Sequence, residues 1–417
     1  MSGTRELAQR TLEAFRRYLE TADTQVKNGI LDAVSVLLGE RMAGLLEENR
    51  KDVLAAEGSG LNPALVDRLS LNEKRVQGMM QACAEVAALP DPSGKITDMT
   101  VRPQGFRVGR MRVPIGVIAI IYEARPNVTI ESAILCLKSG NGVILRGGTA
   151  AFHSNLFLVR IIRDALQSKG IDPCLVSFLE SRDRQAVDEL LLLDDLVHLV
   201  IPRGGEGLIR NVVEKSRIPV LKHYKGVCHV YVDRQADLDM ATRVVLNAKT
   251  QRPAVCNAME TLLVDARVAV DFLPRVLPAL QERGVEIRGC EETRRLYAEG
   301  VKPAAETDWT EEYLDLILSV RVVSGIDEAV RHINTYGSSH TDAIITRDIR
   351  TAQSFIKRVD SASVMVNAST RLADGGVYGL GAEIGISTDR LHARGPMGLE
   401  DLTTYKWIVL GDGHIRE

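Results

Sequence analysis

Residues 116–148, GVIAIIYEARPNVTIESAILCLKSGNGVILRGG, contain the pattern that decides the fold. Two short apolar runs rich in Val and Ile, at 116–122 and 141–148, lie on either side of a helical pattern at 131–140. Apolar runs of this length are typical of strands buried on both faces, and a helix between two such strands favours parallel pairing. The stretch therefore predicts a βαβ unit.

The same alternation continues along the chain and then starts again. The first series continues with a helix at 154–170, a strand at 175–180, a helix at 183–193 and a strand within 196–207. A second series begins near Val230, with elements expected at 229–233, 237–250, 260–266, 316–323, 329–337, 342–348 and 361–369. The sequence thus predicts two α/β domains, each with a parallel sheet covered by helices on both faces.

The segments outside these two series have other patterns. The first 90 residues are expected to be helical, since apolar side chains recur at helical spacing from Ile30 to Leu38. A turn rich in Pro and Gly at 89–95 ends this region, and alternating apolar and basic residues at 99–113 suit an exposed hairpin or arm. A Gly-rich stretch at 374–385 is expected to lead the chain out of the second domain, before a strand-like tail at 403–409.

The composition is that of an ordinary globular protein. The chain has 417 residues, 45% hydrophobic and 26% charged, and 52 Lys and Arg against 55 Asp and Glu leave a net charge of −3. At about 150 residues per domain, this length suggests two or three domains. The balanced charge and the low aromatic content of 4% argue against nucleic acid as a partner.

No segment is expected to enter a membrane. The longest strongly apolar stretch, residues 113–122, is about half of the roughly 20 residues that a spanning helix needs. The charged amino terminus lacks the apolar core of a signal peptide. The six cysteines contain no CxxC pair, which argues against a disulfide framework or a zinc site. We therefore expect free thiols, no metal and a cytoplasmic protein.

Two glycine-rich turns follow expected strands on adjacent positions of the first sheet. They are Leu145-Arg-Gly-Gly-Thr149 and Pro202-Arg-Gly-Gly-Glu-Gly207. Ligands of parallel sheets bind beyond the carboxyl ends of strands, where glycines let backbone N–H groups approach phosphates. The usual nucleotide motifs GxxxxGK[ST] and GxGxxG are absent, as is HExxH. The turns are as consistent with a nucleotide site as with plain strand-to-helix turns.

One cysteine differs from the others in its surroundings. Cys256 lies between a helix pattern and a strand, so that we expect it in a loop, where a catalytic thiol could be accessible. Cys136 and Cys174 lie inside apolar segments and Cys228 precedes a strand. We expect these and the remaining cysteines to be small buried hydrophobic residues. The pattern alone does not exclude that Cys256 is also such a buried hydrophobic residue.

The carboxyl-terminal segment 385–399 is dense in Gly, His and Arg. His392 and Arg394 could lie on the surface of an arm between subunits, and the same cations would also suit an anionic substrate. The residue pattern does not decide between these roles.

Four segments together resemble one family. They are GVIAIIYEARPNVT at 116–129, GNGVILRGG at 140–148, QRPAVCNAMETLLV at 251–264 and STDRLHARGPMGLEDLTTYKW at 387–407. These segments resemble the gamma-glutamyl phosphate reductases, the proline-biosynthesis branch of the aldehyde dehydrogenase superfamily. The resemblance covers nearly the whole chain, and it implies an aldehyde dehydrogenase-like α/β fold with two parallel-sheet domains and an oligomerisation arm.

The resemblance also implies how the chain is divided. An NADP-binding domain would comprise 1–98 and 114–229 with part of 370–384. A catalytic domain carrying the thiol would comprise 230–369, and the arm would comprise 99–113 and 385–417. The protein would then be a homo-oligomer.

The reaction that the resemblance implies is the NADPH-dependent reduction of L-glutamyl 5-phosphate to L-glutamate 5-semialdehyde and phosphate. Cys256 would be the nucleophile, and its thiolate would expel phosphate and leave a thioester. In this superfamily an Asn side chain stabilises the oxyanion, and Asn127 is the nearest counterpart.

The expected cofactor-binding residues come from the two glycine-rich turns. Arg146 stands where the superfamily often has a Lys near the adenosine ribose, and an Arg there is compatible with a 2′-phosphate. The other expected positions are Gly147, Gly148, Gly204, Gly205 and Gly207.

The sequence departs from the superfamily at one informative place. Hydrolytic aldehyde dehydrogenases carry a Glu in a LELGG-type segment, which activates water to cleave the thioester. The comparable stretch here is 219–226, PVLKHYKG, with His223 near the Glu position. An enzyme that makes its thioester from an acyl phosphate gains nothing from activated water, so the change favours acyl-phosphate reduction.

The substrate would bring a phosphate, a carboxylate and an ammonium group. Arg125, His223 and Arg394 are the expected substrate-binding residues, with Lys222 and Lys225 as further cations in loops. Each of these side chains could instead be solvated or paired with a carboxylate.

Two other functions remain open at the level of the sequence. A hydrolytic or CoA-dependent aldehyde dehydrogenase would use the same thiol. A catalytically silent scaffold on the same fold could have lost it, yet Cys256 and its neighbours are intact. Association with glutamate 5-kinase is a further expectation, because acyl phosphates hydrolyse easily.

Overall fold

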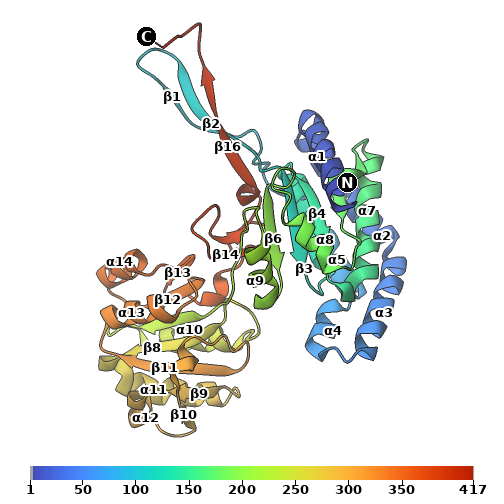
Figure 1. Ribbon diagram of the computed structural model, residues 1–417. Coiled ribbons are helices and arrows are strands. Elements are labelled where there is room, and N and C mark those ends of the chain that lie inside the picture. Colours follow the sequence, from blue (N-terminus) through green and yellow to red (C-terminus); the bar gives the residue numbers. More distant parts are fainter. Residues whose placement is uncertain (1–2, 417) are drawn as a thin grey trace. The chain divides into compact units, whose positions relative to one another are not determined.

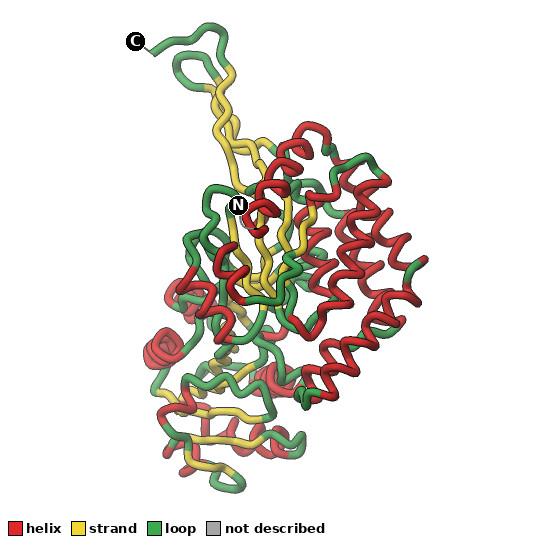
Figure 2. Tube along the Cα trace, turned by 45° about the vertical axis from the view of Figure 1, so that its right-hand side comes forward, coloured by secondary structure: helices red, strands yellow, loops and turns green. Residues whose placement is uncertain are grey.

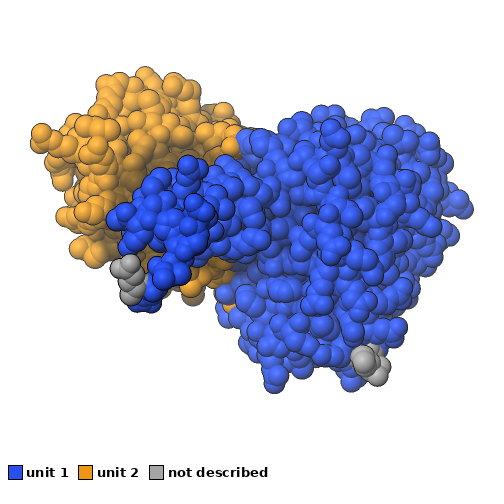
Figure 3. Space-filling view, turned by 90° about the horizontal axis from the view of Figure 1, so that it is seen from above, with its two compact units in different colours: residues 1–222, 379–385, 397–417 blue, residues 223–378, 386–396 orange. Residues whose placement is uncertain are grey.

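The computed structural model describes residues 3–416, apart from the side chains of residues 63 and 64. The chain forms two compact units, which Figure 3 colours separately. Unit 1 consists of Met1–Lys222, Gly379–Gly385 and Met397–Glu417, and unit 2 of His223–Tyr378 and Ile386–Pro396. The Gly-rich stretch at 374–385 thus leads out of unit 2, as expected.

Unit 1 is built on a four-stranded parallel sheet in the order β5-β4-β3-β6. Its strands are β3 (Val117–Tyr122), β4 (Gly142–Arg146), β5 (Val176–Phe178) and β6 (Leu199–Arg203). Every residue of β3 is buried, as the apolar run predicts. β4 and β6 each pair with β3 and not with each other, which corrects the expectation that the two glycine-rich turns follow adjacent strands.

Helices pack beside this sheet (Figures 1 and 2). The amino-terminal helices are α1 (Gly3–Thr21), α2 (Thr24–Glu40), α3 (Met42–Gly58), α4 (Pro63–Leu69) and α5 (Glu73–Ala88). The connections between strands contain α6 (Asn127–Lys138), η1 (Thr149–Ala151), α7 (Phe152–Ser168), η2 (Pro173–Leu175), α8 (Arg184–Leu190) and α9 (Glu206–Lys215). The predicted helical character of the first 90 residues and the βαβ pattern after residue 116 are both confirmed.

A separate three-stranded antiparallel sheet extends from the rest of unit 1 (Figures 1 and 2). Its strands are β1 (Ile96–Val101), β2 (Arg107–Pro114) and β16 (Thr403–Leu410), in the order β1-β2-β16. The hairpin predicted at 99–113 is confirmed, and the carboxyl-terminal strand pairs with β2 along its whole length. Most residues of β1 and β16 are exposed.

Unit 2 contains a seven-stranded parallel sheet in the order β10-β9-β11-β8-β7-β12-β13. The strands are β7 (Cys228–Val232), β8 (Met259–Asp265), β9 (Glu286–Gly289), β10 (Val301–Pro303), β11 (Ile317–Val323), β12 (Thr341–Ile345) and β13 (Ser363–Val366). The helices and 3-10 turns are α10 (Leu238–Thr250), α11 (Ala266–Gln281), α12 (Glu291–Leu296), η3 (Glu306–Trp309), α13 (Ile326–Tyr336), α14 (Ile349–Arg358) and η4 (Thr370–Leu372).

Two apolar cores hold the layers of unit 2 together. One joins α10 and α11 to the sheet through side chains such as Val245, Phe272 and Leu277. The other joins α13 and α14 to the sheet through side chains such as Ile333 and Phe355. The parallel sheet with helices on both faces, predicted for the second domain, is confirmed.

The structure differs from the sequence prediction in several details. The chain enters unit 2 after Lys222 rather than after residue 229, and residues 386–396 of the predicted arm belong to unit 2. The pattern also missed α11, α12 and strands β9 and β10; α11 contains Pro274 and Pro278, which argue against a helix in the sequence. The remaining elements are β14 (Gly385–Ser387), β15 (Gly395–Met397) and η5 (Glu400–Leu402).

None of the six cysteines, all of which lie within residues 3–416, is placed in a disulfide. Cys83, Cys136 and Cys228 are buried as expected, whereas Cys174 and Cys290 are only half-buried, which corrects the expectation for these two. The Cys290 sulfur caps α12 by accepting the N–H of Thr293, and a side chain at a helix start lies at the edge of the core. Within residues 3–416, no helix is both long and apolar enough to cross a membrane.

Candidate active site

Cys256 lies in the loop between α10 and β8, as the sequence predicts, and is half-buried. Two side chains that bracket it tie this loop to the segment around η4. Gln251 accepts a hydrogen bond from the Arg371 Nε at 2.8 Å. The buried Asn257 donates from Nδ2 to the carbonyl of Ala373 at 2.9 Å. The loop is therefore fixed on both sides of the thiol.

The main chain of Cys256 lies against the segment that precedes β7. A Cβ atom at Gly226 would lie 1.9 Å from the carbonyl oxygen of Cys256, so only glycine fits there. The thiol of Cys228 donates to the same oxygen at 3.2 Å. Burial, followed by the charge of Asp342, raises the pKa of Cys228 well above its usual range. Cys228 is thus a buried hydrogen-bond donor, whereas Cys256 is half-buried.

The loops before the strands of unit 2 meet at one edge, because parallel strands share the edge at which they begin. Cys256 precedes β8, Gly226 precedes β7 and Glu312 precedes β11. The Glu312 carboxylate accepts the N–H of Gly226 at 2.8 Å. The hydroxyl of Ser338, before β12, accepts the N–H of Val227 at 2.9 Å. The candidate nucleophile therefore lies at the amino-terminal edge of this sheet.

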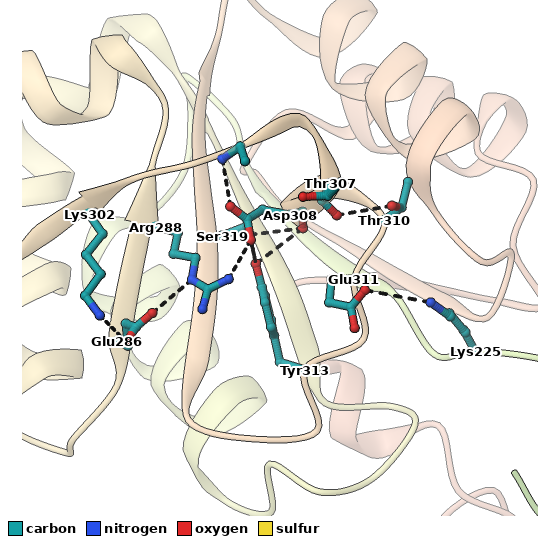
Figure 4. Close-up of polar contacts among 11 residues, drawn as sticks. Lys225, Glu286, Arg288, Lys302, Thr307, Asp308, Thr310, Glu311, Tyr313 and Ser319 are labelled. Carbon is teal, nitrogen blue, oxygen red and sulfur yellow. Dashed lines mark hydrogen bonds and ion pairs between the residues drawn. The ribbon is translucent and has the colours of Figure 1, made fainter. Parts of the chain in front are cut away.

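The segment before β11 is held by a polar cluster around Asp308, drawn in Figure 4. Asp308 accepts hydrogen bonds from Arg288 at 2.7 Å, from the hydroxyl of Tyr313 at 2.8 Å and from the N–H of Ala305 at 2.7 Å. Tyr313 also contacts the hydroxyl of Ser319 at 2.8 Å. These bonds fix the segment whose Glu312 supports Gly226.

His223 takes part in the same edge of the sheet. Its Nδ1 lies 3.0 Å from the carbonyl of Ile386, and because a carbonyl only accepts, this nitrogen carries a proton. The ring also lies 5.8 Å from the ring of His340. Burial, followed by the charge of His223, lowers the pKa of His340 to about 3, so His340 is neutral.

Arg394, an expected substrate-binding residue, is held by a carboxylate in the structure. Its Nη1 donates to Asp360 at 2.8 Å and its Nη2 to the Asp360 carbonyl at 3.0 Å, and Arg390 pairs with the same carboxylate. Its guanidinium is therefore at least partly neutralised. Arg125 is exposed in the turn between β3 and α6.

The two glycine-rich turns of unit 1 leave β4 and β6 at the carboxyl edge of the sheet, on either side of β3. A Cβ atom at Gly147 would lie 2.0 Å from Nδ2 of Asn155, and one at Gly204 would lie 2.6 Å from the carboxyl carbon of Glu123. A Cβ atom at Gly148 would lie 3.2 Å from the backbone of Glu123, whereas nothing lies within 4 Å of a Cβ atom added at Gly205 or Gly207. Close packing against the buried Asn155 thus requires glycine at Gly147, whereas the atoms nearest Gly204 are the ends of the Glu123 and Leu208 side chains.

The helix starts near these turns have no side-chain cap from their own N-cap residues. The N-cap residue is Pro126 for α6 and Gly205 for α9, and neither makes a side-chain capping hydrogen bond. The exposed carboxylate of Glu123 accepts a hydrogen bond from the N–H of Gly205 at 3.0 Å. Asn127, the first residue of α6, donates its Nδ2 to Glu131 at 2.9 Å.

A sequence profile of the aldehyde dehydrogenase family matches residues 38–292. The gamma-glutamyl phosphate reductase of Thermodesulfovibrio yellowstonii is 55% identical over 401 residues, which cover 96% of this chain and 96% of that protein. The chain belongs to the gamma-glutamyl phosphate reductase branch of the aldehyde dehydrogenase family. The relative from Moorella thermoacetica, with the same name, is 54% identical over 98% of this chain and 97% of its own.

Solved structures of this family confirm the fold. The crystal structure of gamma-glutamyl phosphate reductase from Thermotoga maritima matches with a TM-score of 0.97 at 49% identity, over 99% of this chain and 100% of that chain. An acetylating aldehyde dehydrogenase from Geobacillus thermoglucosidasius matches with a TM-score of 0.70 at 16% identity, over 99% and 97%, which shows the fold alone. The predicted aldehyde dehydrogenase-like α/β fold is therefore confirmed.

Membership of the aldehyde dehydrogenase family implies a nicotinamide cofactor, and the residues of unit 1 fit such an anionic group. Arg146 is half-buried, and its Nε is buried without a hydrogen-bond partner while Nη1 donates to the Gly147 carbonyl at 3.0 Å. Burial, followed by the nearby charge of Arg184, lowers the pKa of Arg146. Two guanidinium groups and an orphaned N–H donor favour a phosphate at this turn.

Two features of this branch member escaped the sequence analysis. Lys249 and Glu260 form a fully buried ion pair of 2.6 Å at the two ends of the Cys256 loop, and Glu260 also accepts the N–H of Leu314 at 3.3 Å. Charged residues inside the apolar patterns VVLNAKT and METLLV are the signal that could have shown the pair. The second feature is Arg371, whose place beside the loop depends on contacts that sequence spacing does not give.

Within residues 3–416, no group of three or more His, Cys, Asp or Glu side chains is arranged to hold a metal ion.

Proposed function

We propose that the protein reduces L-glutamyl 5-phosphate to L-glutamate 5-semialdehyde and phosphate with NADPH, the second step of proline biosynthesis. The proposal is supported by relatives that carry the name of this activity at more than half identity over nearly the whole chain. The structural observation that carries it is a half-buried thiol, Cys256, in a loop fixed on both sides, next to a segment with His223 at the place of the hydrolytic Glu.

The chemistry of Cys256 follows from its thiolate. The sulfur attacks the acyl carbon, a carbon–sulfur bond forms, and the carbon–oxygen bond to the phosphate breaks with its electron pair leaving on phosphate. NADPH, when bound, supplies the hydride that reduces the thioester carbon. The carbon–sulfur bond then breaks, which releases the aldehyde and restores the Cys256 thiolate.

The oxyanion that forms at the acyl carbon needs hydrogen-bond donors. We assign one of them to Asn127, as the resemblance implies. In this structure its amide group donates to Glu131. To stabilise the oxyanion, the amide must release Glu131 and donate to the oxyanion instead. Asn127→Ala should lower kcat with little effect on KM, whereas Glu131→Ala should leave kcat unchanged.

The residue at 223 decides what happens to the thioester. Where hydrolytic aldehyde dehydrogenases have a Glu carboxylate as base, this chain has the imidazole of His223, which donates from Nδ1 to the Ile386 carbonyl. Less activation of water leaves the thioester available for reduction rather than hydrolysis. His223→Glu should therefore increase oxidation of the semialdehyde in the absence of phosphate.

We assign cofactor binding to the turns of unit 1. Arg146 would hold the 2′-phosphate of NADPH, and Gly147, Gly148 and the turn from Gly204 to Gly207 would lie near the pyrophosphate. The orphaned Nε of Arg146 supports the preference for NADPH over NADH. Arg146→Ala should weaken NADPH binding about 10-fold or more and leave NADH binding unchanged.

The reverse reaction tests the proposed function. Given L-glutamate 5-semialdehyde and NADP+, the protein should form NADPH only when phosphate is present. Equal turnover without phosphate would identify a hydrolytic dehydrogenase, and turnover with coenzyme A in place of phosphate a CoA-dependent one.

We further propose that the sheet β1-β2-β16 makes the protein a homo-oligomer. Tyr405, Trp407 and Val409 alternate along β16 with 52%, 63% and 61% of their surfaces exposed, an apolar row that a second copy would cover. Trp407→Glu should lower the mass measured by sedimentation without changing the fold. Co-sedimentation with glutamate 5-kinase would test the expected association with that enzyme.

A further inference from the structure

Arg371 lies beside the nucleophile in unit 2. It is part of η4, whose N-cap Ser369 accepts the N–H of Arg371 at 3.3 Å. Its Nε donates to Gln251, which is in the Cys256 loop, at 2.8 Å. The neighbouring bond from Asn257 to the Ala373 carbonyl, 2.9 Å long, fixes the other side of the same loop. The guanidinium is therefore held next to the loop that carries Cys256.

The charges around Arg371 leave it without full compensation. In the part of the chain that the structure describes, neither Arg371 nor the exposed Arg252 forms an ion pair. Burial, followed by repulsion from Arg252, lowers the pKa of Arg371, while the charges of Cys256, Asp374 and Cys228 act in the opposite direction. Asp374 is engaged elsewhere, since its carboxylate accepts the N–H groups of Gly376 and Val377 at 2.9 and 3.3 Å.

Arg394 provides a contrast within the same unit. Both arginines are half-buried, yet the guanidinium of Arg394 is paired with Asp360 at 2.8 Å. Arg371 instead donates to the uncharged amide of Gln251 and has a second guanidinium in electrostatic range. Two guanidinium groups in electrostatic range of each other, neither of them in an ion pair, are stabilised by an anion, and a dianion compensates both.

The substrate of the proposed function offers two anionic groups. The phosphoryl oxygen is bonded to the carbon that Cys256 attacks, so the phosphoryl group must lie close to the sulfur during the reaction. The α-carboxylate is at the far end of the glutamyl chain and carries a single charge. Charge and position therefore both favour the phosphoryl group as the partner of the guanidinium pair.

We propose that Arg371, together with Arg252, binds the phosphoryl group of the acyl phosphate and stabilises the phosphate that leaves when the Cys256 sulfur bonds to the acyl carbon. This inference rests on the proposed function and assigns its phosphate specificity to two residues. In the reverse reaction the same pair binds inorganic phosphate before it attacks the thioester.

The test compares Arg371→Ala, Arg371→Lys and the control Arg358→Ala in the reverse reaction. Arg358 is an arginine of the same unit that pairs with Asp327 on the surface. Arg371→Ala should raise the KM for inorganic phosphate at least about 10-fold, as expected when one bidentate charged contact is lost, with the KM for semialdehyde unchanged. Arg371→Lys should recover part of the loss, and Arg358→Ala should behave as the wild type.

A second measurement does not depend on turnover. Inorganic phosphate should slow the alkylation of Cys256 by iodoacetamide in the wild type and in Arg358→Ala, and it should not do so in Arg371→Ala. A rise in the KM for semialdehyde alone would assign Arg371 to the α-carboxylate and overturn the inference. Phosphate-dependent turnover with an unchanged phosphate KM in Arg371→Ala would overturn it and leave the proposed function standing. A wild type that needs no phosphate would overturn both.

Discussion

The two parallel sheets carry different residues at the carboxyl ends of their strands. In unit 1, β4 ends in Arg146 and β6 in Arg203, and each arginine is followed by two glycines. In unit 2, β7 is followed by Asp233 and β8 ends in Asp265, and both carboxylates are buried. The hydroxyl of Tyr231 lies 3.2 Å from each of them. The carboxyl-terminal edge of the sheet is thus basic in unit 1, where it suits an anion, and acidic in unit 2, where it does not.

This difference explains why we assign cofactor binding to the carboxyl-terminal edge in unit 1 and the nucleophile to the amino-terminal edge in unit 2. Arginines and glycine turns at a carboxyl edge suit a phosphate-bearing cofactor. Aspartates at the corresponding edge of unit 2 satisfy the local N–H groups themselves, as Asp265 does for the N–H of Arg267 at 3.0 Å. Cys256, the proposed nucleophile, lies at the opposite edge of the unit 2 sheet, before β8. Unit 2 therefore uses the sheet as a support for loops at its amino-terminal edge.

The largest expected effect comes from removing the thiol at that edge. Cys256→Ala should lower kcat at least about 1,000-fold, because no other group can form the thioester. NADPH binding, which we propose for unit 1, should remain. Cys228→Ala is the matched control, since the Cys228 thiol is buried and contacts the Cys256 carbonyl and His340 Nδ1. Steady-state kinetics and fluorescence titration with NADPH measure both quantities, and turnover by Cys256→Ala would exclude it as the nucleophile.

The buried pair Lys249–Glu260 should give the largest effect on stability. Burial raises the pKa of Glu260 to about 7 and lowers that of Lys249, so each charge depends on the other. Lys249→Met alone should lower the free energy of unfolding by about 3–5 kcal/mol, because it leaves a buried carboxyl unpaired. The double variant Lys249→Met/Glu260→Leu should regain most of this loss. Urea unfolding of the three proteins measures it, and a double variant as unstable as the single one would show that packing dominates.

Much of the fold could be predicted from the sequence, because buried parallel strands leave continuous apolar runs such as the one at 117–122. The loop position of Cys256 also followed from the pattern on either side of it. The contacts that shape the site could not be predicted. Arg371 and Gln251 are 120 positions apart, and Arg394 and Asp360 are 34 positions apart. Such pairings depend on the packing of distant segments, which spacing along the chain does not record.

Acid should destabilise the active-site edge of unit 2. His340 precedes β12 and burial lowers its pKa to about 3, against about 6.5 for an unfolded histidine. Between these values the unfolded chain binds more protons than the folded one, so stability is lost as the pH falls. At about pH 5 the loss from His340 should be on the order of 2 kcal/mol. His340→Asn should reduce this pH dependence in unfolding measured from pH 7 to pH 4; an unchanged dependence would mean that other groups cause it.

A smaller effect is expected at the basic edge of unit 1. Gly147→Ala should weaken NADPH binding about 10-fold, because a Cβ atom would lie 2.0 Å from the buried Asn155 and displace the turn. Gly78→Ala, in α5 of the same unit, is the control, since nothing lies within 4 Å of its added carbon. If Gly147→Ala lowered the melting temperature and left the dissociation constant of NADPH unchanged, the turn would be purely structural.

The smallest effect concerns the acidic edge of unit 2. Asp265→Ala removes the N-cap of α11 and one acceptor of Tyr231, and it should cost about 1–2 kcal/mol of unfolding free energy. The KM for NADPH and for the acyl phosphate should stay the same, because this edge is assigned no ligand. A change in either KM without a change in stability would contradict the contrast between the two edges.

The most direct test of the account is to trap the acyl group on the protein. The wild type is incubated with L-glutamate 5-semialdehyde and NADP+ without phosphate, and its peptides are analysed by mass spectrometry. The account predicts a glutamyl thioester on the peptide that contains Cys256, which added phosphate removes. An unmodified Cys256, or an acyl group on another cysteine, would contradict it.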